Sequence, residues 1–285
     1  MNDLFNYCTI NVSLSKKTKT LNIVFKEESK YITLETLFEL ESVLAWASGR
    51  VEIRSIFISS NNGFISEGID KERLAEMSSS KLAKMSQKLQ TIVHAMFHLP
   101  QTIVMDMGQG SFDIASELAL GADIRVCAHN AMIAFNHNRV GLVPSSGGIG
   151  FLSVIVGQAM ARNWTLTGRE ISSSQLLMSG FISEQYDQGN RENCVEDALE
   201  AIYNSAPVQR IQTKLGLLEN ARIEFERATK YERSISEAAR TSEDWKEQDG
   251  SFMKGKSMST SVKLSIVKDG HNKGKTRGKD GDLPN

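Results

Sequence analysis

The sequence predicts an α/β fold in which strands and helices alternate along the chain. Short apolar runs of strand-like composition recur, amphipathic helical segments separate them, and turn-forming residues lie between the two. Strand–helix–strand units of this kind have right-handed crossovers, and ligands collect at their strand ends. With 285 residues, of which 40% are hydrophobic, the chain can bury a substantial core in one or two domains.

The first half of the sequence supplies these elements in order. Residues 21–26 alternate apolar and polar side chains, as a half-buried strand does, and residues 33–47 space their leucines for an amphipathic helix. Residues 54–60 form a β-branched and aromatic run that ends in the turn-forming NNG. Residues 81–99 predict a second amphipathic helix, which Pro100 ends. Three more runs are strand candidates: 101–107, 122–128 and 131–136.

From about residue 190 the pattern changes to charged helical segments. We therefore expect an α/β core over residues 1–190, a helical region over 191–257 and a disordered polar tail over 258–285, where Lys and Gly are frequent. A nucleic-acid-binding arm is the alternative for this tail. The aromatic side chains that stack on bases are absent from it, which favours a plain solvated tail.

Composition excludes several classes of protein. The formal charge of −1 and the pI near 6.5 give no reason to expect a nucleic-acid or membrane partner. No stretch reaches the roughly 18 apolar residues of a membrane span, and the N-terminus lacks a secretory pattern. Cys8, Cys127 and Cys194 are few and far apart, so they indicate neither disulfides nor zinc, and a reducing cytoplasm is expected.

The chemistry-bearing residues gather around residues 108–137. The loop GQGSFDIA (108–115) leads from a strand into a helix and offers Asp113 as a helix N-cap. The first amides of a helix have no internal partners, so such a loop can bind a ligand oxygen. Glu117 falls in the first turn of this helix, where it either stabilises the helix end or serves as an acid/base group.

Five segments occur in a characteristic order: GFISEGIDKERLAEM at 63–77, ELALGADIRV from residue 117, GLVPSSGG at 141–148, LTGREISSSQLLMSGFIS at 166–183 and SEDWKEQDGSFMKGK at 242–256. In order and spacing they resemble the crotonase (enoyl-CoA hydratase/isomerase) family. The corresponding family motifs are A-G-x-D, C-E-L-A-x-x-x-D-I, P-E-x-x-L-G-x-x-P-G-x-G-G, a helix introduced by L-T-G, and E-G-x-x-A-F-x-x-K. The resemblance covers roughly residues 10 to 257.

This resemblance implies a spiral of ββα units with a C-terminal helical region that builds homotrimers or hexamers. It implies an acyl-CoA thioester as substrate, with coenzyme A as part of the substrate and no other cofactor. The implied reaction is the hydration or isomerisation of an enoyl-CoA in fatty acid metabolism, through an enolate that an oxyanion hole stabilises.

The resemblance also implies roles for individual residues. By position, the backbone amides of Glu67 and Ile114 form the oxyanion hole, and Glu117 takes the place of the first catalytic glutamate. The second glutamate lies four residues before the glycine of GLVP, a position that is His137 here. The implied coenzyme A or substrate-binding residues are Ser66, Gly68, Ile69, Asp70 and Lys254.

A Glu–His pair differs chemically from the pair of glutamates found in the family's hydratases. Two adjacent carboxylates share a proton, whereas a carboxylate beside an imidazole favours the ion pair. This suits water activation by Glu117 with proton delivery by His137, or a base role for His137 itself. The alternative for His137 is an ordinary polar residue in a homologue that has lost activity.

Departures from the family pattern keep two other functions open. Glu67 stands where the family usually has alanine, residues 113–115 replace a run of glycines, and Asn136 and His137 replace the family's proline and glutamate. These changes favour a catalytically impaired acyl-CoA-binding homologue. Other members of the family carry out hydrolysis, decarboxylation or dehalogenation with differently placed groups, and a histidine at position 137 suits several of these.

His94 and His98 have the i, i+4 spacing of metal ligands, but no third ligand accompanies them, so no metal site is predicted. The serines at 78–80 and 145–146 lack the strand-to-helix elbow of a nucleophile.

Overall fold

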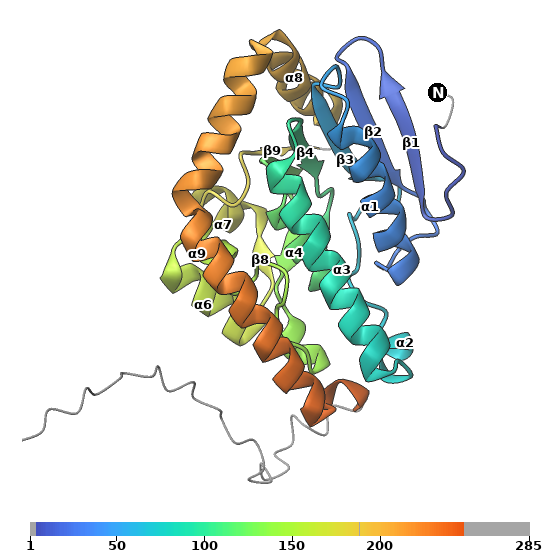
Figure 1. Cartoon of the computed structure of the whole chain (residues 1–285), viewed down its shortest axis with the longest axis vertical. Helices are drawn as coiled ribbons and strands as arrows, with labels where there is room; N and C mark the ends of the chain where they lie inside the picture. Colours follow the sequence, from blue (N-terminus) through green and yellow to red (C-terminus); the bar gives the residue numbers. More distant parts are fainter. Residues whose placement is uncertain (1–3, 188, 248–285) are drawn as a thin grey trace, which may run out of the picture. The chain divides into compact units, whose positions relative to one another are not determined.

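Two β-sheets form the framework of the protein in a computed structural model that describes residues 4–187 and 189–247 (Figure 1). The larger sheet has the strand order β1-β2-β3-β4-β6-β9, in which β1 is antiparallel to β2 and every other neighbouring pair is parallel. Its strands are β1 (Ile10–Ser15), β2 (Thr20–Phe25), β3 (Ser55–Ser60), β4 (Thr102–Asp106), β6 (Ile124–Ala128) and β9 (Glu184–Tyr186).

The smaller sheet has the order β5-β7-β8, and the segments that follow β5 and β7 contain Glu117 and His137. Its strands are β5 (Gly110–Phe112), β7 (Met132–Ala134) and β8 (Ile171–Ser172). The chain comes unusually close to itself here. A Cβ at Gly108, where φ is +56°, would lie 2.1 Å from the carbonyl oxygen of Gly63, so this turn needs glycine.

The helices include the segments predicted above and several others. They are α1 (Leu34–Ser48), α2 (Lys71–Ala75), α3 (Ser79–His98), α4 (Ile114–Leu120), α5 (Phe151–Val156), α6 (Gln158–Thr167), α7 (Ser173–Met178), α8 (Arg191–Asn204), α9 (Pro207–Ser242) and the 3₁₀ turns η1 (His137–Val140) and η2 (Asp244–Lys246). Thr33 starts α1 with a reciprocal capping box, and α3 ends two residues before Pro100, as proline requires.

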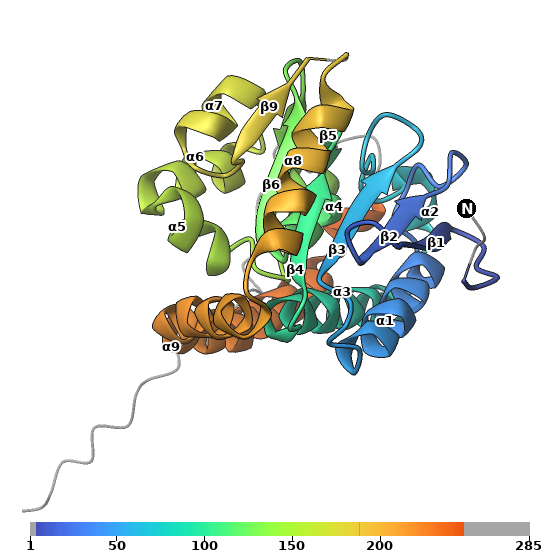
Figure 2. The same cartoon turned by 90° about the horizontal axis from the view of Figure 1, so that it is seen from above.

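Helices cover both faces of the larger sheet. Figure 2 shows α9, α3 and α1 side by side on one side of the strands, and α3 contacts both of its neighbours. On the other side α8 packs its apolar face on β3, β4 and β9, through Cys194, Val195, Leu199 and Ile202. One main core joins the two sheets and most of the helices, and its largest fully buried side chains include Trp164, Phe25, Phe135 and Phe181.

The α/β organisation predicted from the sequence is confirmed. The predicted strands correspond to β2, β3, β4, β6 and β7, and the predicted helices to α1 and α3. The charged segments after residue 190 form α8 and α9 as expected. The sequence analysis missed β1, β5, β8 and β9. Within the described residues, no helix is both long and apolar enough to cross a membrane.

Candidate active site

The topology of the smaller sheet brings Glu117 and His137 together. Strands β5 and β7 pair in parallel, so the segments that follow them emerge at the same edge. Helix α4 follows β5 and carries Glu117 in its first turn, while η1 follows β7 and begins at His137. Both side chains are buried, and His137 Nε2 lies 3.0 Å from Glu117 Oε2. The pair that the sequence places 20 residues apart is in direct hydrogen-bond contact.

Glu117 also organises the loop that contains residues 145–150. Its Oε1 accepts hydrogen bonds from the backbone amides of Ser145, Ser146 and Gly148, at 2.9, 2.7 and 3.1 Å. A buried carboxylate is stable only when such donors compensate for its lost hydration. Both oxygens of Glu117 are therefore occupied, one by the 145–150 loop and the other by His137.

A second buried carboxylate holds the same loop from the opposite side. Glu232 of α9 accepts from Gly147 at 2.9 Å, and from Ile149 and Gly150 at 2.9 and 3.1 Å. Burial, together with the negative charge of Glu117, raises the pKa of Glu232 to about 7, although its three amide donors act in the other direction. The 145–150 loop is thus clamped between α4 and α9 by two carboxylates.

The contact between this loop and α9 is tight enough to test. A Cβ at Gly150 would lie 1.9 Å from the Cβ of Ala228 in α9, although the backbone of Gly150 (φ −91°) suits alanine. We expect Gly150→Ala to lower the free energy of unfolding by about 1–3 kcal/mol through overpacking. Gly49→Ala is the matched control, because nothing lies within 4 Å of its Cβ position and its φ is −86°. Urea denaturation should show the control unchanged or slightly stabilised. Equal stability of both variants would contradict this packing.

The electrostatics of the pair favour a charged imidazole. Burial by itself would lower the pKa of His137. The charge and hydrogen bond of Glu117, the charge of Asp113 and a backbone hydrogen bond with Phe135 outweigh it and raise the pKa above the ordinary value. His137 Nδ1 is buried and makes no hydrogen bond of ordinary geometry among the described residues, although the backbone of Phe135 lies close enough to favour the charged imidazole. One imidazole nitrogen is thus committed to Glu117, and the other is available for proton transfer.

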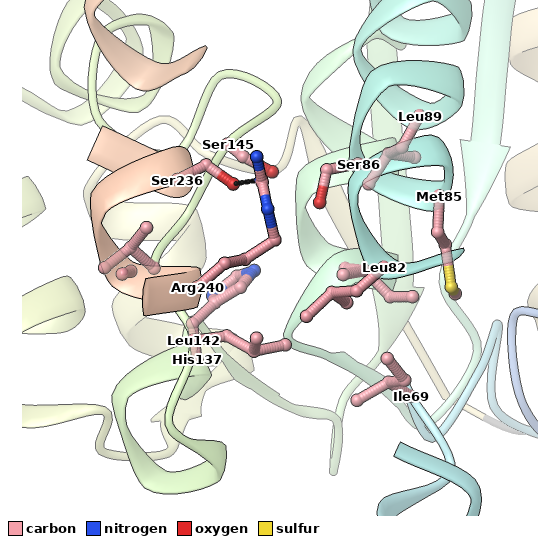
Figure 3. A pocket seen from close by; sticks show the side chains of 13 residues that line it. Ile69, Leu82, Met85, Ser86, Leu89, His137, Leu142, Ser145, Ser236 and Arg240 are labelled. Atoms are coloured by element: carbon pink, nitrogen blue, oxygen red, sulfur yellow. Dashed lines mark hydrogen bonds between the residues drawn. The ribbon is translucent and has the colours of Figure 1, made fainter. Parts of the chain in front are cut away.

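A small cavity opens beside His137 (Figure 3). Leu82, Met85 and Leu89 of α3 lie on one side of it, and Ser236 and Arg240 of α9 lie on the other, where the Arg240 guanidinium contacts the Ser236 hydroxyl at 2.9 Å. Its volume is about 20 Å³, which is room for about one water molecule. We refer to it as the inner cavity. His137 is part of its wall, whereas Glu117 is not among the described residues that line it.

A larger cavity of about 250 Å³ adjoins the inner one and shares Ile69 and Met85 with it. We refer to it as the outer cavity. Glu35, Asp70, Arg73 and Lys81 bring two negative and two positive charges to its wall, which is otherwise mostly apolar. The two cavities together lead from the His137 imidazole toward a surface that carries both signs of charge.

Two backbone amides converge on one point at the inner end of these cavities. The amide of Ile69 donates to Asp113 Oδ1 at 3.0 Å, and the amide of Ile114 donates to the same oxygen at 2.5 Å. The amide of Glu67, which the family resemblance pairs with Ile114, donates instead to the carbonyl oxygen of Lys30 at 2.8 Å. The geometry therefore pairs Ile114 with Ile69, and the oxygen that they share belongs to the protein itself.

Of the other residues in the candidate site, Ile69 and Asp70 line the outer cavity. Ser66 is buried, donates to the carbonyl oxygen of Lys30 and accepts from the amide of Gly68. Lys254 lies outside the described residues. His94 and His98 stack on each other, with ring centroids 4.4 Å apart, near the end of α3.

Glu232 and Arg240 were not predicted from the sequence as site residues. Both lie on α9, more than 90 residues after His137, and charged residues are common on that helix. Asp113 was identified only as a helix cap. One signal was available for it, namely a carboxylate in a loop whose neighbours include two glycines.

Comparison with known proteins identifies the family of this chain. Residues 21–257 match the sequence family of enoyl-CoA hydratases and isomerases. The chain belongs to this family. It is 30% identical over 112 residues to the carnitinyl-CoA dehydratase of Salmonella agona. The aligned residues make up 39% of this chain and 43% of that protein. It is 29% identical over 138 residues to the carnitinyl-CoA dehydratase of Escherichia coli strain ATCC 8739, which covers 48% and 53% of the two chains. The chain spans about half the length of these curated relatives.

Solved structures of the family share the fold. The enoyl-CoA hydratase of Bacillus halodurans superposes with a TM-score of 0.77 at 21% identity, over 84% of this chain and 98% of that one. An enoyl-CoA hydratase/isomerase of Pseudoalteromonas atlantica gives a TM-score of 0.75 at 20% identity, over 87% and 97%. The crotonase resemblance and the crotonase-like fold predicted from the sequence are both confirmed.

Proposed function

We propose that this family member is an acyl-CoA hydratase or dehydratase in which His137 transfers the proton and Glu117 orients and charges the imidazole. The observation that carries the proposal is the state of the imidazole. Its Nε2 is held by a buried carboxylate, its Nδ1 is buried without a hydrogen bond of ordinary geometry, and the residue lines a cavity. A carboxylate that accepts Nε2–H leaves Nδ1 as the nitrogen that gains and loses the proton. The neutral fraction of His137, which grows as the pH rises through its raised pKa, carries the Nδ1 lone pair that acts as a base.

In the proposed hydration, Nδ1 takes a proton from water as the water oxygen bonds to the β-carbon of an enoyl thioester. The electron pair of the double bond moves through the α-carbon to the thioester oxygen and forms an enolate. The imidazolium then returns the proton to the α-carbon, so one water molecule is added in total. Dehydration is the same sequence in reverse. We assign the oxyanion hole to the amides of Ile69 and Ile114, which stabilise developing negative charge best in a site without water.

The outer cavity supports an acyl-CoA as the substrate class. It is lined by Ile69, and Lys81 offers a positive charge that suits the phosphates of coenzyme A, whereas Arg73 is paired with Asp70 at 3.3 Å. The curated relatives act, by name, on a carnitinyl thioester, which makes carnitinyl-CoA a reasonable first substrate to assay. Trimer or hexamer formation, cytoplasmic location and the absence of any cofactor besides coenzyme A stay predictions from the resemblance.

The test is turnover of a thioester panel that contains crotonyl-CoA, a 3-enoyl-CoA and carnitinyl-CoA. We expect the wild-type protein to turn over at least one of them, and His137→Gln to lower kcat by about 10²–10⁴-fold. His98→Gln is the matched control, since His98 lies on the exposed end of α3. A wild-type protein that converts no thioester in the panel would exclude the proposed activity, and equal rates for both variants would exclude the role of His137.

A catalytically impaired acyl-CoA-binding protein is the second candidate. One observation favours it: the inner cavity has a volume of only about 20 Å³, and a protein carboxylate occupies the point where the two amides meet. Calorimetric titration with crotonyl-CoA separates the two candidates, because binding without turnover supports the second.

A further inference from the structure

The amides of Ile69 and Ile114 form an anion position that is already filled. They come from separate segments, one from the loop before α2 and the other from the first residue of α4. Both donate to one atom, Asp113 Oδ1, and both residues line the inner cavity. We refer to this point as the anion position. An N-cap carboxylate ordinarily accepts from the second or third amide of its helix. Asp113 instead turns back onto the first amide and reaches across to Ile69.

The backbone of Asp113 is held in a conformation that aspartate rarely adopts. Its φ of 39° and ψ of −112° lie near the first central position of a type II′ turn, where glycine dominates. Such a conformation persists only when the surroundings enforce it, and it is concentrated at functional sites. Two bonds involving the Asp113 backbone amide contribute here, one to the carbonyl oxygen of Ala134 at 2.9 Å and one to the side chain of Asn136 at 3.0 Å.

Space for the carboxylate depends on Gly68. A Cβ at this position would lie 2.3 Å from Asp113 Oδ1 and 2.4 Å from Oδ2. Gly68 also has a φ of +88°, so any other residue would be strained as well as crowded. The absence of a side chain at residue 68 is therefore what lets the carboxylate reach the Ile69 amide.

The charges around Asp113 leave it poised between two protonation states. Burial raises its pKa to about 6, the charge of Glu117 in α4 adds to that effect, and His137 of η1 with the amides of Ile114 and Ile69 opposes it. Arg240 of α9 lines the same cavity as Ile69 and Ile114. The carboxylate is thus bound and mostly ionised at pH 7, and it loses its charge as the pH falls through about 6.

We propose that the Asp113 carboxylate is an internal ligand of the anion position, and that a thioester oxygen enters this position only when the carboxylate has left it. The first claim, that the carboxylate is an internal ligand, is independent of the proposed function, and we call it the internal-ligand part. The second claim, about the thioester oxygen, rests on the proposed function, and we call it the thioester part. Asp113 then sets the affinity of the site for the carbonyl group of a substrate, while contributing no proton to the reaction.

The internal-ligand part is tested without coenzyme A, by NMR titration of the full chain with acetate. In Asp113→Gly the anion position is vacated, and glycine suits the local backbone. We expect saturable shifts of the Ile69 and Ile114 amide signals with millimolar acetate in this variant. The wild type and Asp113→Asn should show none, because an oxygen still fills the position in each. The internal-ligand part is excluded if acetate does not shift the two amide signals of Asp113→Gly. It is also excluded if acetate shifts the same signals of the wild type equally.

The thioester part is tested with two ligands that differ by one oxygen, butyryl-CoA and the thioether S-butyl-CoA. We expect the wild type to bind both with equal affinity, and Asp113→Gly to bind butyryl-CoA at least tenfold tighter than the thioether. A wild type that already prefers butyryl-CoA tenfold would overturn the inference, and this measurement needs no variant. If no form of the protein binds either ligand, the proposed function and the thioester part both fall, and the acetate titration still decides the internal-ligand part.

Discussion

Replacing Glu117 with glutamine is expected to lower kcat by about 10²–10⁴-fold while the protein stays folded. Three backbone amides converge on Glu117 Oε1, so the glutamine must present its amide oxygen to them. Its NH₂ group then faces His137 Nε2 and donates to it. That arrangement forces the imidazole proton onto Nδ1 and removes the lone pair that we assign to proton transfer. A comparable tautomer change in serine proteases lowers kcat by about 10⁴-fold.

The same substitution should move the pH dependence of the remaining activity. In the wild type the charge of Glu117 outweighs the effect of burial and raises the pKa of His137, so activity that needs neutral imidazole rises with pH through this elevated pKa. Without the carboxylate, burial dominates and the pKa falls, so the rise in activity should occur at lower pH. Turnover of the best substrate in the thioester panel, measured from pH 5 to 9, checks both expectations.

Glu39→Gln is the control for this experiment. Glu39 is also a buried carboxylate that accepts backbone hydrogen bonds, from the amides of Cys8 and Thr9. It lies on α1, against the segment before β1, and is not part of the candidate site. Its substitution should leave kcat and the pH profile unchanged. If Glu117→Gln keeps the wild-type pH profile, Glu117 does not set the protonation of His137, whatever the size of its effect on kcat.

The resemblance to the crotonase family was sufficient to predict that Glu117 and His137 belong to one site. The structure supplies the physical reason, because the parallel strands β5 and β7 deliver the segments that follow them to the same edge. The amide that pairs with Ile114 was harder to predict. Residues 67–69 lie in a loop, and which of their amides turns inward depends on the positive φ of Gly68. Spacing gives the segment, but not the direction of each N–H bond.

The contacts of α9 could not be predicted from the sequence, for a different reason. Glu232 meets the 145–150 loop across 82 to 85 residues of chain. Which of the many charged residues of α9 faces inward depends on how a 36-residue helix crosses α3 and α5. The short strands β8 and β9, with two and three residues, were missed because such lengths carry no usable periodicity.

Stability is expected to fall as the pH rises from 4.5 to 7, and Glu232 makes a separable contribution to this. The pKa of Glu232 rises from 4.5 to about 7 on folding, because burial near Glu117 disfavours its charge. The folded state therefore binds the proton more tightly than the unfolded state does. The resulting stabilisation is fully present below pH 4.5 and is lost as the pH rises through about 7. At 1.36 kcal/mol per pKa unit, the loss is about 3 kcal/mol.

Glu232→Gln should remove this contribution. The pKa of Asp113 is raised to about 6 and that of His137 is also raised, so both contribute a loss of the same sign as the pH rises, and both contributions remain in the variant. The test is therefore the difference between the two proteins in urea denaturation at pH 4.5, 6 and 8. We expect the wild type to lose about 3 kcal/mol more than Glu232→Gln across this range. Glu39→Gln serves again as the reference, and parallel pH curves for the wild type and Glu232→Gln would show that the α9 carboxylate ionises as freely in the folded protein as in the unfolded chain.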